Sequence, residues 1–133
     1  MSDFTREELL SIVHKLNGAD LRGIDLVDAN LRGANLLAVN LSGNKLNGAN
    51  LVSANLSEAD LSNTDLRGSR PVGADMSEAN LTSADLSGAD LRWAHLTEAC
   101  LIDANLTGVQ YNADTKWPEG FDPQSAGAVL VDG

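Results

Sequence analysis

The chain has 133 residues, one cysteine and a formal net charge of −10; 43% of its residues are hydrophobic and 4% are aromatic. This length indicates one domain, and a single cysteine excludes an internal disulfide. The sequence has no apolar run of transmembrane length, no basic stripe typical of nucleic-acid binding and no basic-then-apolar signal pattern at its N-terminus, so we expect a cytoplasmic protein without membrane insertion that does not bind nucleic acid.

The first expected element is a short helix over residues 6–15. Thr5 and Glu8 have the spacing of a capping box, with Thr5 as the N-cap. Phe4 and Leu9 are spaced for a hydrophobic staple across the same helix start. The apolar residues from Leu9 onward lie on one side of such a helix. We therefore expect residues 1–15 to form a helical cap on the layer that follows.

Leucine recurs at every fifth position from Leu16 to Leu106, and among these nineteen positions only Pro71 and Met76 differ. A small residue, usually Ala, stands two positions earlier, and Asp or Asn directly precedes fourteen of the nineteen. Neither a helix nor a flat strand would keep such residues on one side. A backbone that turns a corner in every unit would keep them all inside, with four units closing a square coil of about twenty residues. The strict period indicates an architectural repeat.

This unit, A-(D/N)-L-x-x, resembles the repeat of pentapeptide repeat proteins. The matching units run from His14-Lys15-Leu16 to Val109-Gln110-Tyr111. The resemblance implies an all-β solenoid, a right-handed quadrilateral β-helix of about five coils, over residues 16–111. It also implies that the central Leu and the residue two before it point inward. The segment from Thr115 to Pro123 resembles a tail of small cyanobacterial members.

The inward positions define the expected core. Asn44 and Thr64 occupy the small inward position in successive coils, so we expect them to be stacked neighbours inside. A buried amide needs partners, so we predict a hydrogen bond between them, to backbone or to trapped water. Pro71 lacks an amide donor, which predicts a local bulge or a weakened contact between coils. Representative core residues are Leu21, Leu36, Leu56, Leu86, Leu106, Ala34 and Ala54.

After Tyr111 the repeat stops, and residues 112–133 are expected to form an irregular C-terminal cap. Trp117 and Phe121 are candidate lids over the last leucine layer. Cys100 falls at an outward position, where it is an incidental exposed thiol or has a redox or intermolecular role.

The acidic residues of the repeat region divide into two groups. Seven of the twelve directly precede a central Leu, where Asn is equally frequent. That position therefore favours an Asp or Asn side chain, which forms a hydrogen bond with nearby backbone in a turn. The other outward charges are about balanced and comprise Asp28, Glu58, Glu78, Glu98 and Asp103 against Arg22, Arg32, Lys45, Arg67, Arg70 and Arg92.

Some family members are inferred to inhibit DNA gyrase by presenting an acidic rod shaped like a duplex. Scattered bases would weaken the phosphate-like potential that such a mimic requires. A DNA-mimicking inhibitor of DNA gyrase or topoisomerase therefore stays the alternative function for this chain.

Two outward clusters are candidate interaction surfaces. Glu58, Glu78 and Glu98 should stack on one face, near Asp75 and His95, where they form a partner surface, bind a cation or are simply a solvated face. Trp93, Arg70 and Arg92 form the second cluster, together with Arg32, Val52 and Val72. An exposed Trp beside Arg is typical of interfaces, so Trp93 is the best single candidate.

The sequence predicts no catalytic residue, cofactor or metal site. It contains no nucleophile–base–acid set and no Gly-rich phosphate loop, and His14 and His95 are too far apart in the register to form a metal pair. We therefore favour a non-enzymatic structural or protein-interaction module. It would act as a monomer or weak dimer that binds an unknown protein partner through the faces of the β-helix.

Overall fold

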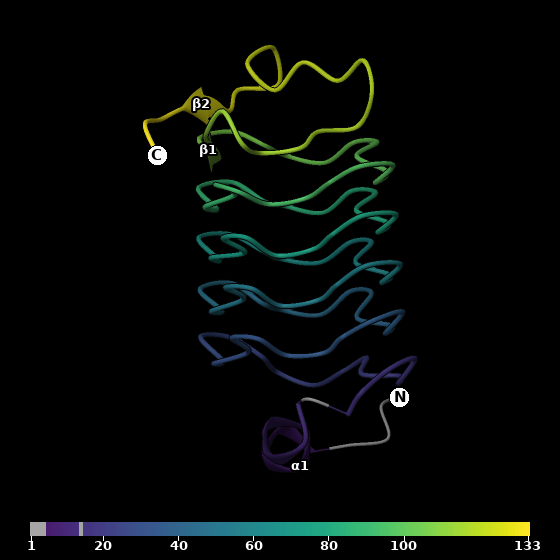
Figure 1. The fold of residues 1–133 in the computed structure, drawn as a ribbon. Helices are drawn as coiled ribbons and strands as arrows, with labels where there is room; N and C mark the ends of the chain where they lie inside the picture. Colours follow the sequence, from purple (N-terminus) through teal and green to yellow (C-terminus); the bar gives the residue numbers. More distant parts are fainter. Residues whose placement is uncertain (1–4, 14) are drawn as a thin grey trace.

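A computed structural model describes residues 5–13 and 15–133. It contains a helix, α1 (Arg6–Ser11), and two short strands, β1 (Gln110–Tyr111) and β2 (Val129–Leu130). Between α1 and β1 the chain winds through a stack of angular coils (Figure 1). Within the described residues, no helix is long and apolar enough to cross a membrane. Phe4 and His14 lie outside the described residues, and so do the expected staple and the first unit's inward position.

Each corner of the coils is a β-turn whose third residue has a positive φ. The amide of Ala54, for example, donates to the carbonyl of Leu51 at 3.0 Å, and Ser53 between them has a φ of 59°. This combination defines a type II turn, which glycine adopts most easily. Glycine nevertheless occupies only nine of the nineteen equivalent positions from Gly18 to Gly108. The remaining ten carry a side chain that the turn itself does not require.

Successive coils are joined by parallel β-bridges between residues twenty positions apart, as between Asn30 and Asn50. The amide of Leu31 donates to the carbonyl of Asn50 at 2.8 Å, and that of Gly33 donates to Val52 at 2.9 Å. Four five-residue units therefore make one coil. Because each coil pairs its backbone with its neighbours, the stack satisfies polar groups that an isolated coil would leave open.

The central leucines fill the interior. Leu21, Leu56 and Leu86 are completely buried, and Ala34 and Ala54 beside them are equally enclosed. Leu36 and Leu106 are exposed by no more than 2%. Layers of Leu and Ala thus leave no room for rings inside the coils, which explains the low aromatic content.

The helix α1 starts with the expected capping box. The Thr5 hydroxyl accepts from the Glu8 amide at 3.2 Å, and the Glu8 carboxylate accepts from the Thr5 amide at 3.1 Å. The helix ends at Ser11, however, not at residue 15 as expected. The carbonyl of Val13 accepts from the amide of Asn35 at 2.9 Å. The chain has therefore joined the ladder between coils by Val13 and cannot continue as a helix.

The helix α1 lies against the open end of the first coil (Figure 1). Leu9 is completely buried there. The Arg6 guanidinium donates to the carbonyl of Asp25, and also to that of Val27 at 3.2 Å. These contacts occupy backbone acceptors that have no coil beneath them.

The C-terminal segment is more regular than expected, because it returns to the ladder. Strand β2 pairs in parallel with β1, with Gln110 opposite Val129 and Tyr111 opposite Leu130. Trp117 packs against the core and meets the Tyr111 ring edge-on, with centroids 5.4 Å apart.

Asn44 and Thr64 are both buried, and their hydrogen bonds go to backbone rather than to each other. Asn44 donates through Nδ2 to the carbonyl of Leu21 at 2.7 Å and accepts through Oδ1 from the amide of Gly23 at 2.8 Å. The Thr64 hydroxyl donates to the carbonyl of Leu61 at 2.6 Å. Asn44 thus replaces a backbone acceptor of the ladder with its own side chain.

Pro71 causes no bulge. The amide of Ala74 donates to its carbonyl at 3.0 Å, as in an ordinary unit. One coil earlier, the amide of Leu51 donates to the carbonyl of Arg70 at 3.1 Å, but Pro71 has no amide with which to repeat this bond. Among the described residues no β-bridge joins Arg70 to Asp90. The contact between these coils is therefore weakened by one bond while the turn keeps its length.

Candidate functional site

The Asp and Asn residues that precede the central residues hold the corners in place. All fourteen accept a hydrogen bond from the amide two residues later. Asn50, for example, accepts from Val52 at 3.1 Å, and Asp75 accepts from Ser77 at 3.0 Å. These are Asx turns, so the aspartates at this position serve the fold first.

Three of these aspartates also bind an arginine two residues later. The pairs are Asp20–Arg22 at 2.9 Å, Asp65–Arg67 at 2.7 Å and Asp90–Arg92 at 2.7 Å. Hydrogen bonds from the Arg67 guanidinium lower the pKa of Asp65. Burial raises the pKa of Asp90, but its hydrogen bonds with Arg92 outweigh that effect, so the pKa is lowered.

These pairs change the charge balance expected for the surface. They neutralise three of the six bases in the repeat region. Among the described residues, the other three have no salt-bridge partner and face a larger number of outward acids. The outward surface is therefore clearly acidic and not balanced. The three bases outside salt bridges are Arg32, Lys45 and Arg70.

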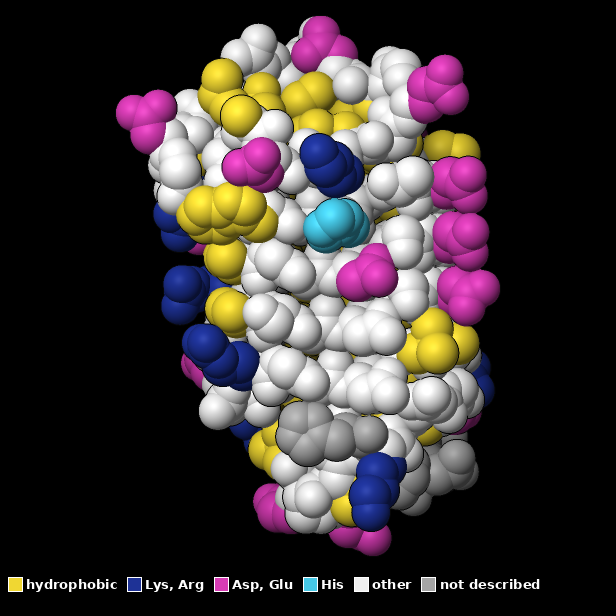
Figure 2. All heavy atoms as spheres, viewed as in Figure 1, with side chains coloured by type: hydrophobic (Ala, Val, Ile, Leu, Met, Phe, Trp, Pro, Cys, Tyr) yellow, Lys and Arg dark blue, Asp and Glu magenta, His cyan; other side chains and the backbone are white. Residues whose placement is uncertain are grey.

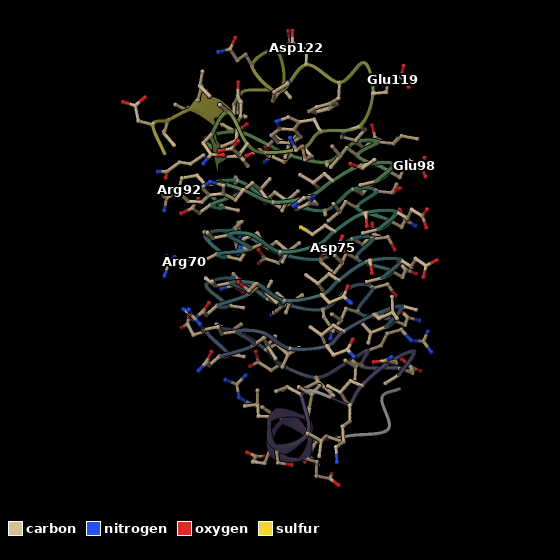
Figure 3. All side chains as sticks on the ribbon, in the orientation of Figure 1. Arg70, Asp75, Arg92, Glu98, Glu119 and Asp122 are labelled. Carbon is tan, nitrogen blue, oxygen red and sulfur yellow. The ribbon has the colours of Figure 1, made fainter. Side chains whose placement is uncertain are left out.

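Glu58, Glu78 and Glu98 form an acidic ladder. Each occupies the third turn position of its unit, with a φ of 60° to 62°, and each is exposed. The negative charges of Glu58 and Glu98 raise the pKa of Glu78. A column of acidic side chains follows one edge of the molecule in Figure 2, and Figure 3 places Glu98 on that edge. The ladder is a real cluster of like charge that the fold does not require.

Between this edge and the opposite one lies the face that carries Asp75 and His95. The two residues are bridged in adjacent coils, and Figure 3 shows Asp75 near the middle of this face. Within the described part of the chain, no group of three His, Cys, Asp or Glu side chains is arranged to hold a metal ion.

Trp93 and Arg92 form the centre of the second candidate surface. Trp93 is 39% exposed and has a φ of 60°. The Arg92 guanidinium carbon lies 5.6 Å from the Trp93 ring centroid, within the range of a cation–π contact. The Trp93 amide donates to Oδ1 of Asn112 at 3.1 Å. The C-terminal segment therefore helps to fix the backbone from which this ring projects.

Arg70 lies on the same edge of the molecule as Arg92, one above the other in Figure 3. Its charge contributes to the lowered pKa of Asp90. The structure thus brings Trp93, Arg92 and Arg70 together as an aromatic-basic patch, and it places this patch on the edge opposite Glu98. Figure 2 shows the same separation of basic and acidic side chains. The two candidate clusters are separate surfaces.

Sequence reasoning missed a groove at the C-terminal end of the stack. Its volume is about 360 Å³, and it lies between the unit around Leu101 and a loop that contains Phe121. Ile102 could have indicated this groove from the sequence, because it is a large aliphatic residue at an outward position, and it is 64% exposed in the structure. A second groove of about 310 Å³ lies beside Asn44, whose amide is already bonded. Cys100 is half-buried, and a hydrogen bond with the Thr82 hydroxyl lowers its pKa.

A family model described as pentapeptide repeats matches residues 15–43, 34–70 and 74–109. Among solved structures, alr5209, a pentapeptide repeat protein from Nostoc PCC 7120, is 38% identical with a TM-score of 0.76, and the match covers 77% of this chain and 84% of that one. Rfr23 from the cyanobacterium Cyanothece 51142 is 41% identical with a TM-score of 0.67, over 74% and 64% of the two chains.

HetL from Nostoc sp. strain PCC 7120, described as involved in the regulation of heterocyst differentiation, is 29% identical with a TM-score of 0.64. That match covers 86% of this chain and 57% of HetL. A search of curated proteins found no significant match. The first two structures and the family model identify the stack of coils as the right-handed β-helix solenoid of pentapeptide repeat proteins.

Proposed function

The chain belongs to the pentapeptide repeat family, and we propose that it is a non-enzymatic cytoplasmic module that binds a protein partner through the aromatic-basic patch. The proposed module has about five coils over residues 16–111. Residues 1–15 and 112–133 cap its two ends and so protect exposed ladder edges from aggregation. Its specific partner would be selected by the side chains that the coils present.

The observation that carries this proposal is the exposed ring of Trp93 on a turn position that needs no ring. Nine of the equivalent positions are glycine, and a side chain at positive φ is strained by roughly 1–2 kcal/mol. Trp93 is nevertheless held in place from two directions. Its backbone is bonded to Asn112, and Arg92 lies against its ring. An aromatic ring held rigidly at the surface loses little conformational entropy when a partner covers it.

Arg92 and Arg70 extend this ring into a surface of mixed chemistry. Asp90 fixes Arg92, so the Arg92 guanidinium contributes mainly shape and stacking. Arg70 is exposed and forms no salt bridge with the described residues, so it can bind a carboxylate of the partner. Trp and Arg are enriched among the residues that dominate interface energies. A partner with an acidic residue next to an apolar pocket fits this patch.

Affinity capture with matched variants tests the proposal. Trp93→Gly removes the ring and suits the positive φ, so it should fold. Ser53→Gly, which has the same kind of turn with a φ of 59°, is the control. We expect wild type and Ser53→Gly to retain the same proteins from an extract of the native cells, and Trp93→Gly to lose roughly tenfold or more of a specific one. Equal retention by all three proteins would contradict the proposal.

The acidic excess favours a second candidate function, that of a DNA-mimicking inhibitor of DNA gyrase or topoisomerase. Three of the six bases in the repeat region pair with aspartates of the Asx turns, so the five other outward acids face three bases without a salt bridge, and the outward charge is closer to that of a phosphate backbone than the count by position indicated. A supercoiling assay with purified protein, accompanied by its mass in solution, distinguishes the two functions. Inhibition by a dimer would support the mimic, whereas no inhibition by a monomer would exclude the mimic and leave binding at the patch to be tested by the affinity capture.

A further inference from the structure

The C-terminal segment pairs with three sides of the last coil and leaves one side open. The backbone carbonyl of Lys116 accepts from the amide of Leu96 at 2.7 Å, and the carbonyl of Gly127 accepts from the amide of Gly108 at 2.9 Å. Val129 donates to the carbonyl of Val109 at 2.7 Å. The remaining side is formed by residues 99–103, which we call the open edge.

The open edge has unpaired ladder groups at the positions that are paired one coil below. There, the amide of Leu81 donates to Cys100 at 2.8 Å, and the amide of Ser83 donates to Ile102 at 2.9 Å. The corresponding amides of Leu101 and Asp103 have no hydrogen-bond partner in residues 5–13 and 15–133. These two free donors stand two residues apart at the start of the turn from Leu101 to Ala104, and free ladder donors of this kind are what an incoming segment pairs with.

An apolar groove of about 360 Å³ follows this edge, lined by Ala99, Leu101 and Ile102 on one side and by the loop of residues 118–121 on the other. Leu101 is only partly buried, whereas Leu81 one coil below is completely buried. The side chain that would complete the layer above Leu101 is therefore missing. A single aliphatic side chain delivered by an incoming strand fits this space.

The rim of the groove is acidic. Glu119 lines it, and Glu98 and Asp103 belong to the same end coil. Figure 3 shows Glu98 and Glu119 on one side of the C-terminal end. A second copy of this chain, with its formal net charge of −10, would bring acids against acids. Charge complementarity therefore favours a basic occupant.

We propose that the open edge binds an extended, basic peptide segment of a partner protein by strand addition, with one aliphatic side chain of that segment in the groove. The segment's carbonyls accept from the amides of Leu101 and Asp103. Its own amide donates to the carbonyl of Ala99, as Cys100 donates to Ala79 at 2.9 Å one coil below. Lysine or arginine residues beside the aliphatic residue lie near Glu119 and Asp103. This site is independent of the aromatic-basic patch.

Hydrogen exchange measured by NMR tests this directly in the full chain. The probe is a short blocked synthetic peptide in which Lys and Thr alternate on either side of one central Leu. In the free protein the amides of Leu101 and Asp103 should exchange quickly, because they have no acceptor in the described residues, whereas those of Leu81 and Ser83 should be protected. The peptide should slow exchange at Leu101 and Asp103 by roughly tenfold or more, because it supplies their missing acceptors, and should leave Leu81 and Ser83 unchanged.

Matched variants identify the groove as the cause. Ile102→Ser removes apolar surface from it and should weaken peptide binding by roughly tenfold. Leu130→Ser removes a similarly exposed aliphatic side chain from β2, at 53% exposure against 64% for Ile102, and should leave binding unchanged. A peptide methylated at the amide that faces Ala99 should bind more weakly than the parent.

Four results would overturn the proposal. The first is that the amides of Leu101 and Asp103 are already protected from exchange in the free protein, and the second is that the peptide fails to protect them at any concentration. The third is that a peptide with Glu in place of Lys protects them equally well, which would exclude a preference for basic peptides. The fourth is protection that rises with protein concentration alone, which would assign the edge to a second copy of the chain.

Discussion

The Asp90 carboxylate accepts two hydrogen bonds from the Arg92 guanidinium, at 2.9 Å from Nε and at 2.7 Å from the terminal nitrogen. The same carboxylate accepts from the Arg92 amide at 3.2 Å, so one side chain both closes the turn and orients the arginine. Arg92 in turn lies against Trp93. The Asx position that builds the fold thus also arranges the aromatic-basic patch.

Replacing Asp90 with Asn separates these two roles. Asn retains an oxygen for the Arg92 amide but loses the ion pair, so we expect a stability loss of about 1 kcal/mol or less at neutral pH. The pKa of Asp90 is lowered in the folded state. The ion pair therefore contributes its full stabilisation above the unfolded-state pKa of about 3.9, and this stabilisation is lost as pH falls through the pKa of the folded state. Urea denaturation of both proteins at neutral and acidic pH measures the difference. A difference that persists in acid would contradict the ion-pair explanation.

The acidic ladder has the opposite pH dependence. The pKa of Glu78 is raised by Glu58 and Glu98, so its ionised form destabilises the fold above the folded pKa, and the cost disappears as pH falls below the unfolded value. Glu78→Gln should therefore melt at a higher temperature than wild type at neutral pH and at the same temperature in acid. Asp103→Gln, outside the ladder, is the control. Wild type melting higher at neutral pH would show that the ladder stabilises the fold.

The leucine layers should resist truncation strongly. Leu56 is completely buried in the middle of the stack, and coils tied together by backbone ladders cannot collapse around a cavity. We expect Leu56→Ala to lower the free energy of unfolding by about 2–5 kcal/mol, whereas Leu130→Ala, which truncates an exposed residue, should change it little. Chemical denaturation measures both. An unchanged midpoint for Leu56→Ala would rule out a tightly packed interior.

Asn44 should be more stabilising than the alanine that the repeat prefers at its position. Asn44→Ala would leave the amide of Gly23 without its acceptor at 2.8 Å and the carbonyl of Leu21 without its donor at 2.7 Å. An unsatisfied buried polar group costs about 1–3 kcal/mol, so the variant should be less stable by that amount. Thr64→Ala, which removes a single bond, should cost less. If Asn44→Ala is as stable as wild type, the backbone must re-form its ordinary ladder bond there.

Features set by local chemistry could be read from the sequence. The Asx turns needed only a side-chain oxygen near an amide two residues later, and the capping box of Thr5 and Glu8 was equally local. The end of α1 could not be read, because the bond between Asn35 and Val13 that ends it joins distant positions. Helical periodicity alone cannot reveal a long-range hydrogen bond that competes with the helix for a backbone carbonyl.

The candidate surfaces show the same division. The stacking of Glu58, Glu78 and Glu98 followed from the period of the repeat. The neutralisation of Arg92 by Asp90 was missed, because counting charges by position ignored a partner two residues away across the turn. The open edge near Leu101 depended on the path of the C-terminal segment, which has no repeat and so gives no register from which to infer it.

Site-specific photo-crosslinking tests the central claim, that a protein partner binds at the aromatic-basic patch. A photoreactive phenylalanine analogue is placed at Trp93 or, as the control, at Asn63, which has nearly the same turn geometry with a φ of 57°. After irradiation in the native cells, the account predicts one discrete adduct from the position of Trp93 and none from that of Asn63. No adduct at either position, or the same adducts at both, would contradict it.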